Sequence, residues 1–187
     1  MSAQPTPRST LGEYLDAERT AEVKSEYFDG EVFAMSGGTL VHARIGAALI
    51  QSLGNNLKKG CHVASSDLRV RASERGPFLY PDVTVYCGNP QLADDFKDTL
   101  LNPTIIFEVL SRTSEAYDRG RRFAAYRRIE SLCEYVLVSQ TEPSIESYSR
   151  GSDKWSFTEF NGIDSVCKLS SVDCEIPLSA VYSVLND

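Results

Sequence analysis

Two apolar, strand-like segments each carry one carboxylate, and this pattern constrains the fold more than any other feature of the chain. Segment 78–86, FLYPDVTVY, contains Asp82, and segment 103–111, PTIIFEVLS, contains Glu108. Acidic residues are depleted in strands and costly to bury unless they are paired or bind a cation. We therefore expect both carboxylates to face one site. The alternative is an aspartate at an exposed sheet edge and a glutamate paired with an arginine.

Helix and strand signals around these segments predict a mixed α/β fold. Thr10 begins a capping box ahead of a short helix over 11–18, and Asp29-Gly30 predicts a β-hairpin over 26–35. Thr39 can cap a long helix over 40–58. Further strands are expected at 61–72, 78–86, 103–111 and 134–139, a helix at 115–129, and a tail with strands near 145–149 and 155–160 and a helix at 178–185.

The order of these elements predicts the sheet topology. Polar connections, a short one after the first strand and a longer one after the second, make the strands at 61–72, 78–86 and 103–111 an antiparallel meander. The strand at 134–139 follows a crossover helix, so it should run parallel to the preceding strand. The expected fold is thus a central mixed sheet flanked by helices, with an N-terminal hairpin. On neighbouring antiparallel strands, Asp82 and Glu108 can project from one face within reach of each other.

Length and composition place limits on the class of protein. With 187 residues, 42% of them hydrophobic, we expect one domain: a flank over 1–25, a core over 26–139 and C-terminal strands with a helix over 140–187. No apolar run approaches the ~20 residues of a membrane span. Five cysteines, an odd count without C-x-x-C spacing, argue against a disulfide framework and a zinc ribbon and favour the cytoplasm.

The distribution of charge leaves two explanations open. The net charge of -7 gives the whole molecule no attraction to nucleic acid. Six of the thirteen arginines nevertheless fall within 112–128, where the acidic residues are only Glu115 and Asp118. That stretch can face a phosphate backbone, or it can be a solvated helix face with pairs such as Asp118 to Arg122.

Two converging carboxylates favour a particular chemistry. Hard oxygen ligands with retained waters suit Mg²⁺ or Mn²⁺, which also bind phosphate oxygens of a substrate. Such an ion activates water and neutralises the charge that develops on phosphate. Asp82 and Glu108 therefore predict metal-assisted hydrolysis of a phosphodiester.

The ordered sequence blocks are similar to those of a known group of nucleases. They resemble the PD-(D/E)XK nuclease superfamily, which has the restriction-endonuclease-like fold, and within it the Uma-two family, whose members are regarded as endonucleases. The resemblance spans about 26–139 and rests on SEYFDGEVFAMSGG, YPDVTVY, PTIIFEVLSRTSEAYDRGRRFAAY and SLCEYVLVS. It implies a DNA endonuclease that uses Mg²⁺ or Mn²⁺ and forms a homodimer.

The resemblance also implies roles for particular residues. Asp82 and Glu108 match the two metal-binding carboxylates. The superfamily has a lysine two residues after the glutamate, but this chain has Leu110 there. In the Uma-two family the lysine lies on the following helix, where this chain has Arg122, four residues after Asp118. The expected catalytic set is therefore Asp82, Glu108 and Arg122.

Other residues can complete the metal site. The helix over 40–58 lacks the acidic residue that the superfamily often carries there, so His42, Glu26 or Glu31 can contribute instead. For His42, capping or packing at a helix start is the alternative role. His62 and Tyr126 are expected to be structural.

Three hypotheses follow from these residues. The first is a metal-dependent DNA endonuclease. The second is a nucleic-acid-binding or regulatory module that kept the fold and lost turnover, which Leu110, Arg122 and the acidic net charge favour. The third is a structural or interaction protein whose buried carboxylates are paired by arginines.

Overall fold

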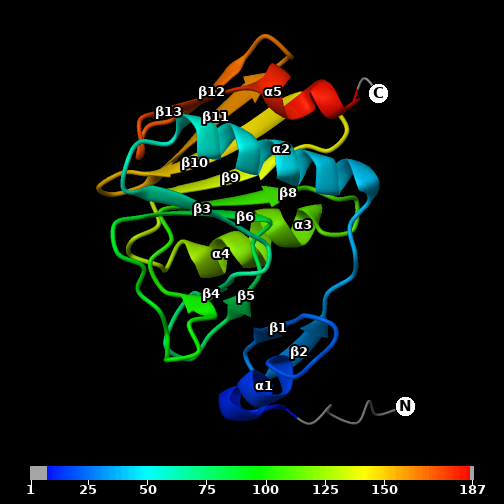
Figure 1. Cartoon of the computed structure of the whole chain (residues 1–187), viewed down its shortest axis with the longest axis vertical. Helices are drawn as coiled ribbons and strands as arrows, with labels where there is room; N and C mark the ends of the chain where they lie inside the picture. Colours follow the sequence, from blue (N-terminus) through cyan, green and yellow to red (C-terminus); the bar gives the residue numbers. More distant parts are fainter. Residues whose placement is uncertain (1–7, 186–187) are drawn as a thin grey trace.

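The computed structural model describes residues 8–185, so part of the predicted N-terminal flank lies outside it. A six-stranded mixed sheet forms its centre (Figure 1). In sheet order its strands are β11 (Trp155–Asn161), β10 (Ser144–Arg150), β9 (Glu134–Val138), β8 (Ile105–Val109), β6 (Val83–Cys87) and β3 (Cys61–Ser65). Strands β3, β6 and β8 are antiparallel neighbours, and β9 is parallel to β8. The predicted meander and crossover are confirmed.

A second, five-stranded sheet lies below the first in Figure 1. In sheet order its strands are β2 (Glu31–Ala34), β1 (Ser25–Phe28), β5 (Phe78–Leu79), β4 (Arg69–Arg71) and β7 (Thr99–Leu100). The continuous strands expected at 61–72 and 78–86 are therefore wrong, because each segment divides between the two sheets. In the second segment the chain changes sheets at Pro81, which has no N–H to donate to a ladder. Asp82 consequently stands directly before β6 rather than inside a strand.

The predicted hairpin of β1 and β2 is confirmed. Asp29 and Gly30 have φ angles of 54° and 89°, the positive values that a type I′ turn requires. Residues opposite each other on the two strands include Glu26 and Phe33. The hairpin joins the remainder of its sheet where Tyr27 of β1 pairs with Phe78 of β5.

One face of the central sheet is covered by α2 (Leu40–Asn56). Thr39 caps this helix as predicted, and its side chain accepts a hydrogen bond from the backbone N–H of His42. Ile45 and Leu49 of α2 are fully buried against the sheet. The same layer contains β12 (Val166–Leu169), β13 (Cys174–Pro177), α5 (Leu178–Tyr182) and a 3₁₀ turn (Ser183–Leu185). Strands β12 and β13 were not expected from the sequence.

The opposite face is covered by a helical segment in three parts (Figure 1). These are α3 (Glu115–Tyr117), a π-helical turn η1 (Asp118–Arg122) and α4 (Phe123–Tyr126). The uninterrupted helix expected over 115–129 is therefore wrong at its centre and at its end. Alternate residues of β8 separate the two layers, since Phe107 packs toward α2 and Ile106 packs toward α4.

The N-terminal helix α1 (Leu11–Glu18) has the predicted capping box at Thr10. It packs beside the hairpin through an aromatic cluster in which the ring of Tyr14 stacks on Tyr27, with centroids 5.1 Å apart. Within residues 8–185, no helix has both the length and the apolar character needed to cross a bilayer.

The cysteine count argued against a disulfide framework, but the structure contains one disulfide. Cys61 and Cys87 form a disulfide between β3 and β6. The two residues are direct partners in the antiparallel register, although 26 positions separate them in sequence. An odd cysteine count excludes only a fully paired set, and strand register brings together cysteines whose spacing gives no signal. Cys133, Cys167 and Cys174 are free.

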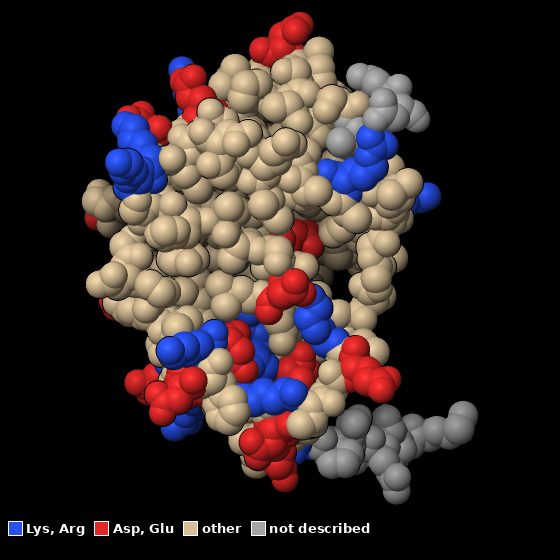
Figure 2. All heavy atoms as spheres, viewed as in Figure 1, with Lys and Arg blue, Asp and Glu red and all other residues tan. Residues whose placement is uncertain are grey.

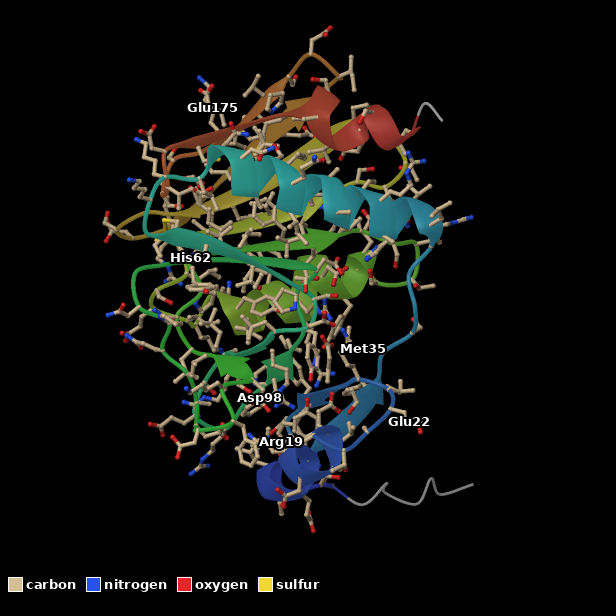
Figure 3. All side chains as sticks on the ribbon, in the orientation of Figure 1. Arg19, Glu22, Met35, His62, Asp98 and Glu175 are labelled. Carbon is tan, nitrogen blue, oxygen red and sulfur yellow. A yellow bond between two sulfur atoms is a disulfide. The ribbon has the colours of Figure 1, made fainter. Side chains whose placement is uncertain are left out.

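A buried arginine near α1 carries one stability prediction. The side chain of Arg69 is 2% exposed and its Nη2 lies 2.6 Å from Asp98 Oδ2. Asp98 also accepts a hydrogen bond from Arg19 at 3.0 Å, and Figure 3 shows Arg19 and Asp98 side by side. Replacing Asp98 with alanine is expected to lower the free energy of unfolding by about 3 kcal/mol, because it leaves a buried guanidinium without its anion. Chemical denaturation at neutral pH measures this loss.

The matched control and the pH dependence make that prediction specific. Asp94→Ala removes a partly exposed ion pair with Arg19 and a hydrogen bond from the backbone N–H of Phe96, and it should cost about 1 kcal/mol because no buried guanidinium loses its anion. Burial by itself would raise the pKa of Asp98, but hydrogen bonds from Arg19, Thr99 and Arg69 outweigh it and lower the pKa to about 2. The stabilisation is therefore present above the ordinary pKa and is lost as the pH falls through about 2. Equal losses in the two variants would contradict the assignment.

Candidate active site

Four carboxylates and one arginine converge in a pocket of ≈ 330 Å³, here named the carboxylate pocket. It lies between the hairpin, the start of α2, the adjoining ends of β6 and β8, and η1. Figure 3 labels Met35, which lines the pocket from the segment between β2 and α2. The charged side chains that line it are Glu26, His42, Asp82, Glu108, Asp118 and Arg122.

Strand register places Asp82 beside Glu108. Val83 pairs with Phe107 in the antiparallel ladder, so the preceding Asp82 stands opposite Glu108 on the same face. The backbone N–H of Val109 donates a hydrogen bond of 2.7 Å to Asp82 Oδ2. The other oxygen, Oδ1, lies 3.1 Å from Nε2 of His42. Both oxygens of Asp82 are thus held in place by neighbouring groups.

Arg122 stands among the other three carboxylates. Its Nη1 lies 2.7 Å from Glu108 Oε2 and 3.4 Å from Asp118 Oδ1, and its Nη2 pairs with Glu26 Oε1. The Arg122 side chain is 11% exposed, whereas Arg121 on the same turn is exposed. Arg122 therefore turns inward as the helical spacing from Asp118 predicts.

The π-helical turn presents Asp118 and Arg122 on the same side. At about 100° per residue, an uninterrupted α-helix would carry Tyr126 about 80° out of line with Asp118. The wider turn holds one extra residue and largely cancels this drift. Tyr126 accordingly points into the core with no exposed surface, and the carbonyl of Asp118 accepts a hydrogen bond of 3.0 Å from the Tyr135 hydroxyl.

Burial makes the carboxylates of this pocket electrostatically costly. It raises the pKa of Glu108 well above its usual value; Arg122 opposes the rise, while Asp82, Asp118 and Glu26 add to it. Burial likewise raises the pKa of Glu26 and of Asp118, again against Arg122. Three buried carboxylates share one guanidinium, so this part of the pocket has an excess of negative charge.

His42 occupies the rim of the same pocket. The hydrogen bond to Asp82 raises the pKa of His42, although burial opposes it. A Cβ atom at Gly38 would lie 2.8 Å from the imidazole ring, so the ring can occupy this position only because residue 38 is glycine. The role of Gly38 was not anticipated from the sequence.

The structure does not bring every candidate residue to the pocket. Glu31 is exposed on β2, near the turn of the hairpin, and is not among the pocket's lining residues. His62 is exposed on β3, where its ring stacks on Tyr86 with centroids 5.3 Å apart, and it is remote from Met35 in Figure 3. Tyr117 was not anticipated, yet it lines the pocket with its ring 5.6 Å from the Arg122 guanidinium.

The donor atoms of the pocket fit a hard divalent cation. Glu108 Oε1 is buried without a hydrogen-bond partner among the described residues, and Asp118 Oδ1 has only the 3.4 Å approach of Arg122. Carboxylate oxygens accept but cannot donate, so each is suited to a cation. Within residues 8–185, no three acidic, histidine or cysteine side chains already stand together in a metal-ligating arrangement. Arg122 supplies the positive charge between Glu26 and Glu108.

Comparisons with known proteins point to one family. The model of the Uma2 family, described as "Putative restriction endonuclease", matches residues 11–177. Two uncharacterized proteins of Synechocystis are related: slr1290 is 34% identical over 182 residues, covering 95% of this chain and 93% of its own. The second, sll1609, is 32% identical over 163 residues, covering 86% of this chain and 92% of its own.

A solved structure shares the fold. The crystal structure of a "putative nuclease" from Anabaena variabilis matches with a TM-score of 0.76 and 17% identity, covering 95% of this chain and 99% of that one.

Proposed function

Because the chain belongs to the Uma2 family and has the restriction-endonuclease-like fold, we propose that it is an endonuclease that hydrolyses phosphodiester bonds in DNA with Mg²⁺ or Mn²⁺. The observation that carries the proposal is the convergence of four carboxylates, one of them with an unpartnered buried oxygen, beside a buried arginine in one open pocket. A pocket built to hold only an ion pair would not need the additional negative charge.

Particular residues of the pocket have distinct parts in this proposal. Glu108 and Asp82 would hold the ion, which supplies a water of lowered pKa and neutralises charge on the phosphate. Arg122 stays protonated, so it can bind phosphate oxygens in a planar fork but cannot accept a proton from water. His42 Nε2 and Asp82 Oδ1 face each other at 3.1 Å and can share a proton at the rim.

A specific observation also supports a second candidate. Arg122 is held by Glu26 and Glu108, and the strand position that carries lysine in the superfamily is Leu110, which packs in the core. A chain with these two features can retain the fold and bind nucleic acid without turnover. Only a hydrolysis assay separates this binding module from an active endonuclease.

The hydrolysis assay has a definite expected result. The purified chain should nick supercoiled plasmid slowly with Mn²⁺ or Mg²⁺ at low salt, and a chelator should stop it. Low salt is needed because counterions weaken phosphate binding steeply. Metal binding is measured separately by calorimetry without DNA. The binding module would be favoured over the endonuclease if the chain binds no metal and nicks none of the four substrates, which are single- and double-stranded DNA and RNA.

A further inference from the structure

A second pocket, here named the arginine pocket, lies next to the carboxylate pocket along β1 and η1. Its volume is ≈ 420 Å³, and three arginines from two separate parts of the chain line it. Arg75 comes from the turn between β4 and β5, Arg121 from η1, and Arg128 from the chain just after α4. Asp29 is the single acidic residue among the lining side chains that the structure describes.

The three arginines carry uncompensated charge. Several buried or half-buried arginines elsewhere are paired with carboxylates, as Arg69 is with Asp98 and Arg122 is with Glu108. Across residues 8–185, by contrast, no ion pair involves Arg75, Arg121 or Arg128. Arg121 is nevertheless positioned, because its guanidinium lies 3.8 Å from the centroid of the Phe28 ring. The arginine pocket therefore holds three arginines without an ion-pair partner, although the chain as a whole has a net charge of -7.

The two pockets are neighbours along one face of β1. Glu26 lines the carboxylate pocket and Phe28 lines the arginine pocket, and residues two apart on a strand share a face about 7 Å apart. On η1, Arg122 lines the carboxylate pocket and its neighbour Arg121 lines the arginine pocket. Figure 2 shows charged side chains of both signs concentrated over the lower half of the molecule, while the surface over α2 is largely uncharged.

We propose that the arginine pocket binds phosphodiester groups of the nucleic-acid strand next to the one that enters the carboxylate pocket. The identity of the polymer rests on the proposed function. A strand of B-form DNA presents one phosphate every 3.4 Å or so along its axis, so a single strand can occupy both pockets at once. Guanidinium forks suit phosphate oxygens, and three of them can offset the repulsion between an acidic protein and a polyanion.

Binding without turnover tests the proposal. Arg75→Gln/Arg128→Gln removes two charges from the pocket and leaves Arg121, the neighbour of Arg122, in place. Fluorescence anisotropy with labelled single-stranded and duplex DNA oligonucleotides in EDTA should show about a tenfold or greater loss of affinity at low salt. The slope of log K against log salt should become shallower by about 1.8 for duplex and about 1.4 for single strands. RNA of the same sequence shows whether phosphodiesters of both polymers are accepted.

A charge-matched control excludes a general effect. Lys59→Gln/Lys168→Gln removes the same charge from exposed positions on other elements. This variant should bind as the parent does. The proposal is overturned if the arginine double variant keeps the parent's affinity and slope, or if the lysine control loses as much.

A measurement on the unaltered chain does not depend on how any variant folds. DNA should protect Arg75, Arg121 and Arg128 from phenylglyoxal, as mapped by mass spectrometry, but not the exposed Arg127 of the same segment. Equal protection by inorganic phosphate alone would indicate a site for a single anion and overturn the strand assignment. If nucleic-acid binding depends on these arginines but neither Mg²⁺ nor Mn²⁺ gives nicking, the proposed endonuclease activity is contradicted, while phosphodiester binding by the arginine pocket is supported.

Discussion

Replacing Arg122 with glutamine is expected to lower the free energy of unfolding by about 3–5 kcal/mol, because the change leaves buried carboxylates without their cation. Glu26, Glu108 and Asp118 all face this guanidinium. Urea denaturation at neutral pH measures the loss. The control is Arg127→Gln, a change of the same chemistry at an exposed position of the same segment, and it should have little effect.

The pH dependence tests the cause of that destabilisation. Burial has already raised the pKa of each of the three carboxylates in the folded protein, and loss of Arg122 raises them further. A raised folded-state pKa means that stability is present at low pH and is lost as the pH rises. The difference between the variant and the parent should therefore shrink as the pH falls toward 5. A variant as stable as the parent at neutral pH would show that Arg122 is not the counter-ion.

Arg122→Lys separates two possible roles of this side chain in hydrolysis. Lysine keeps the charge, so most of the stability should remain. If the residue only attracts phosphate, the nicking rate should change little. If it must orient the attacking water as a compact donor, lysine should raise the rate.

Glu108→Gln is expected to remove metal binding and activity while leaving the fold as stable as before or more stable. Loss of a direct metal ligand should reduce metal affinity and nicking by more than about 100-fold. Loss of a residue that only hydrogen-bonds to a ligand usually has a smaller effect. Burial is the main cause of the raised pKa of Glu108, so a neutral amide avoids the cost of a buried charge and also removes one of the negative charges around Arg122. Calorimetry with Mn²⁺, the plasmid assay and thermal melting measure the three quantities.

Glu31→Gln is the matched control for Glu108→Gln. The same substitution on the exposed end of the hairpin should leave metal binding, nicking and melting unchanged. If Glu108→Gln bound the metal as tightly as the parent does, the ion would have to be held by other carboxylates. A lower melting temperature would mean that the charged form of Glu108 stabilises the fold through Arg122.

Several elements are predictable from local chemistry alone. The Asp29-Gly30 turn and the caps at Thr10 and Thr39 depend on short-range hydrogen bonds and backbone angles, so their signals lie within a few residues. The pairing of Asp82 and Glu108 on one face was also predictable, because carboxylates in apolar segments are costly unless they share a site. Their roles in metal binding stay a prediction.

The remaining features depend on contacts between distant segments. The chain's passage from one sheet to the other at Pro81 cannot be distinguished from one long strand by apolar pattern alone. The disulfide between Cys61 and Cys87 follows from strand register rather than from cysteine spacing. The pairing of Arg69 with Asp98 likewise joins segments about thirty residues apart and has no local signature.

The wide turn at Asp118–Arg122 bears on how relatives should be aligned. In evolutionary terms a π-helical turn is equivalent to one inserted residue, and its loss would restore a regular helix with a different phase on either side. Asp118 and Tyr126 would then no longer lie in line, and one of them would have to leave its present position. Alignments that treat the segment as gap-free can match residues that point in different directions.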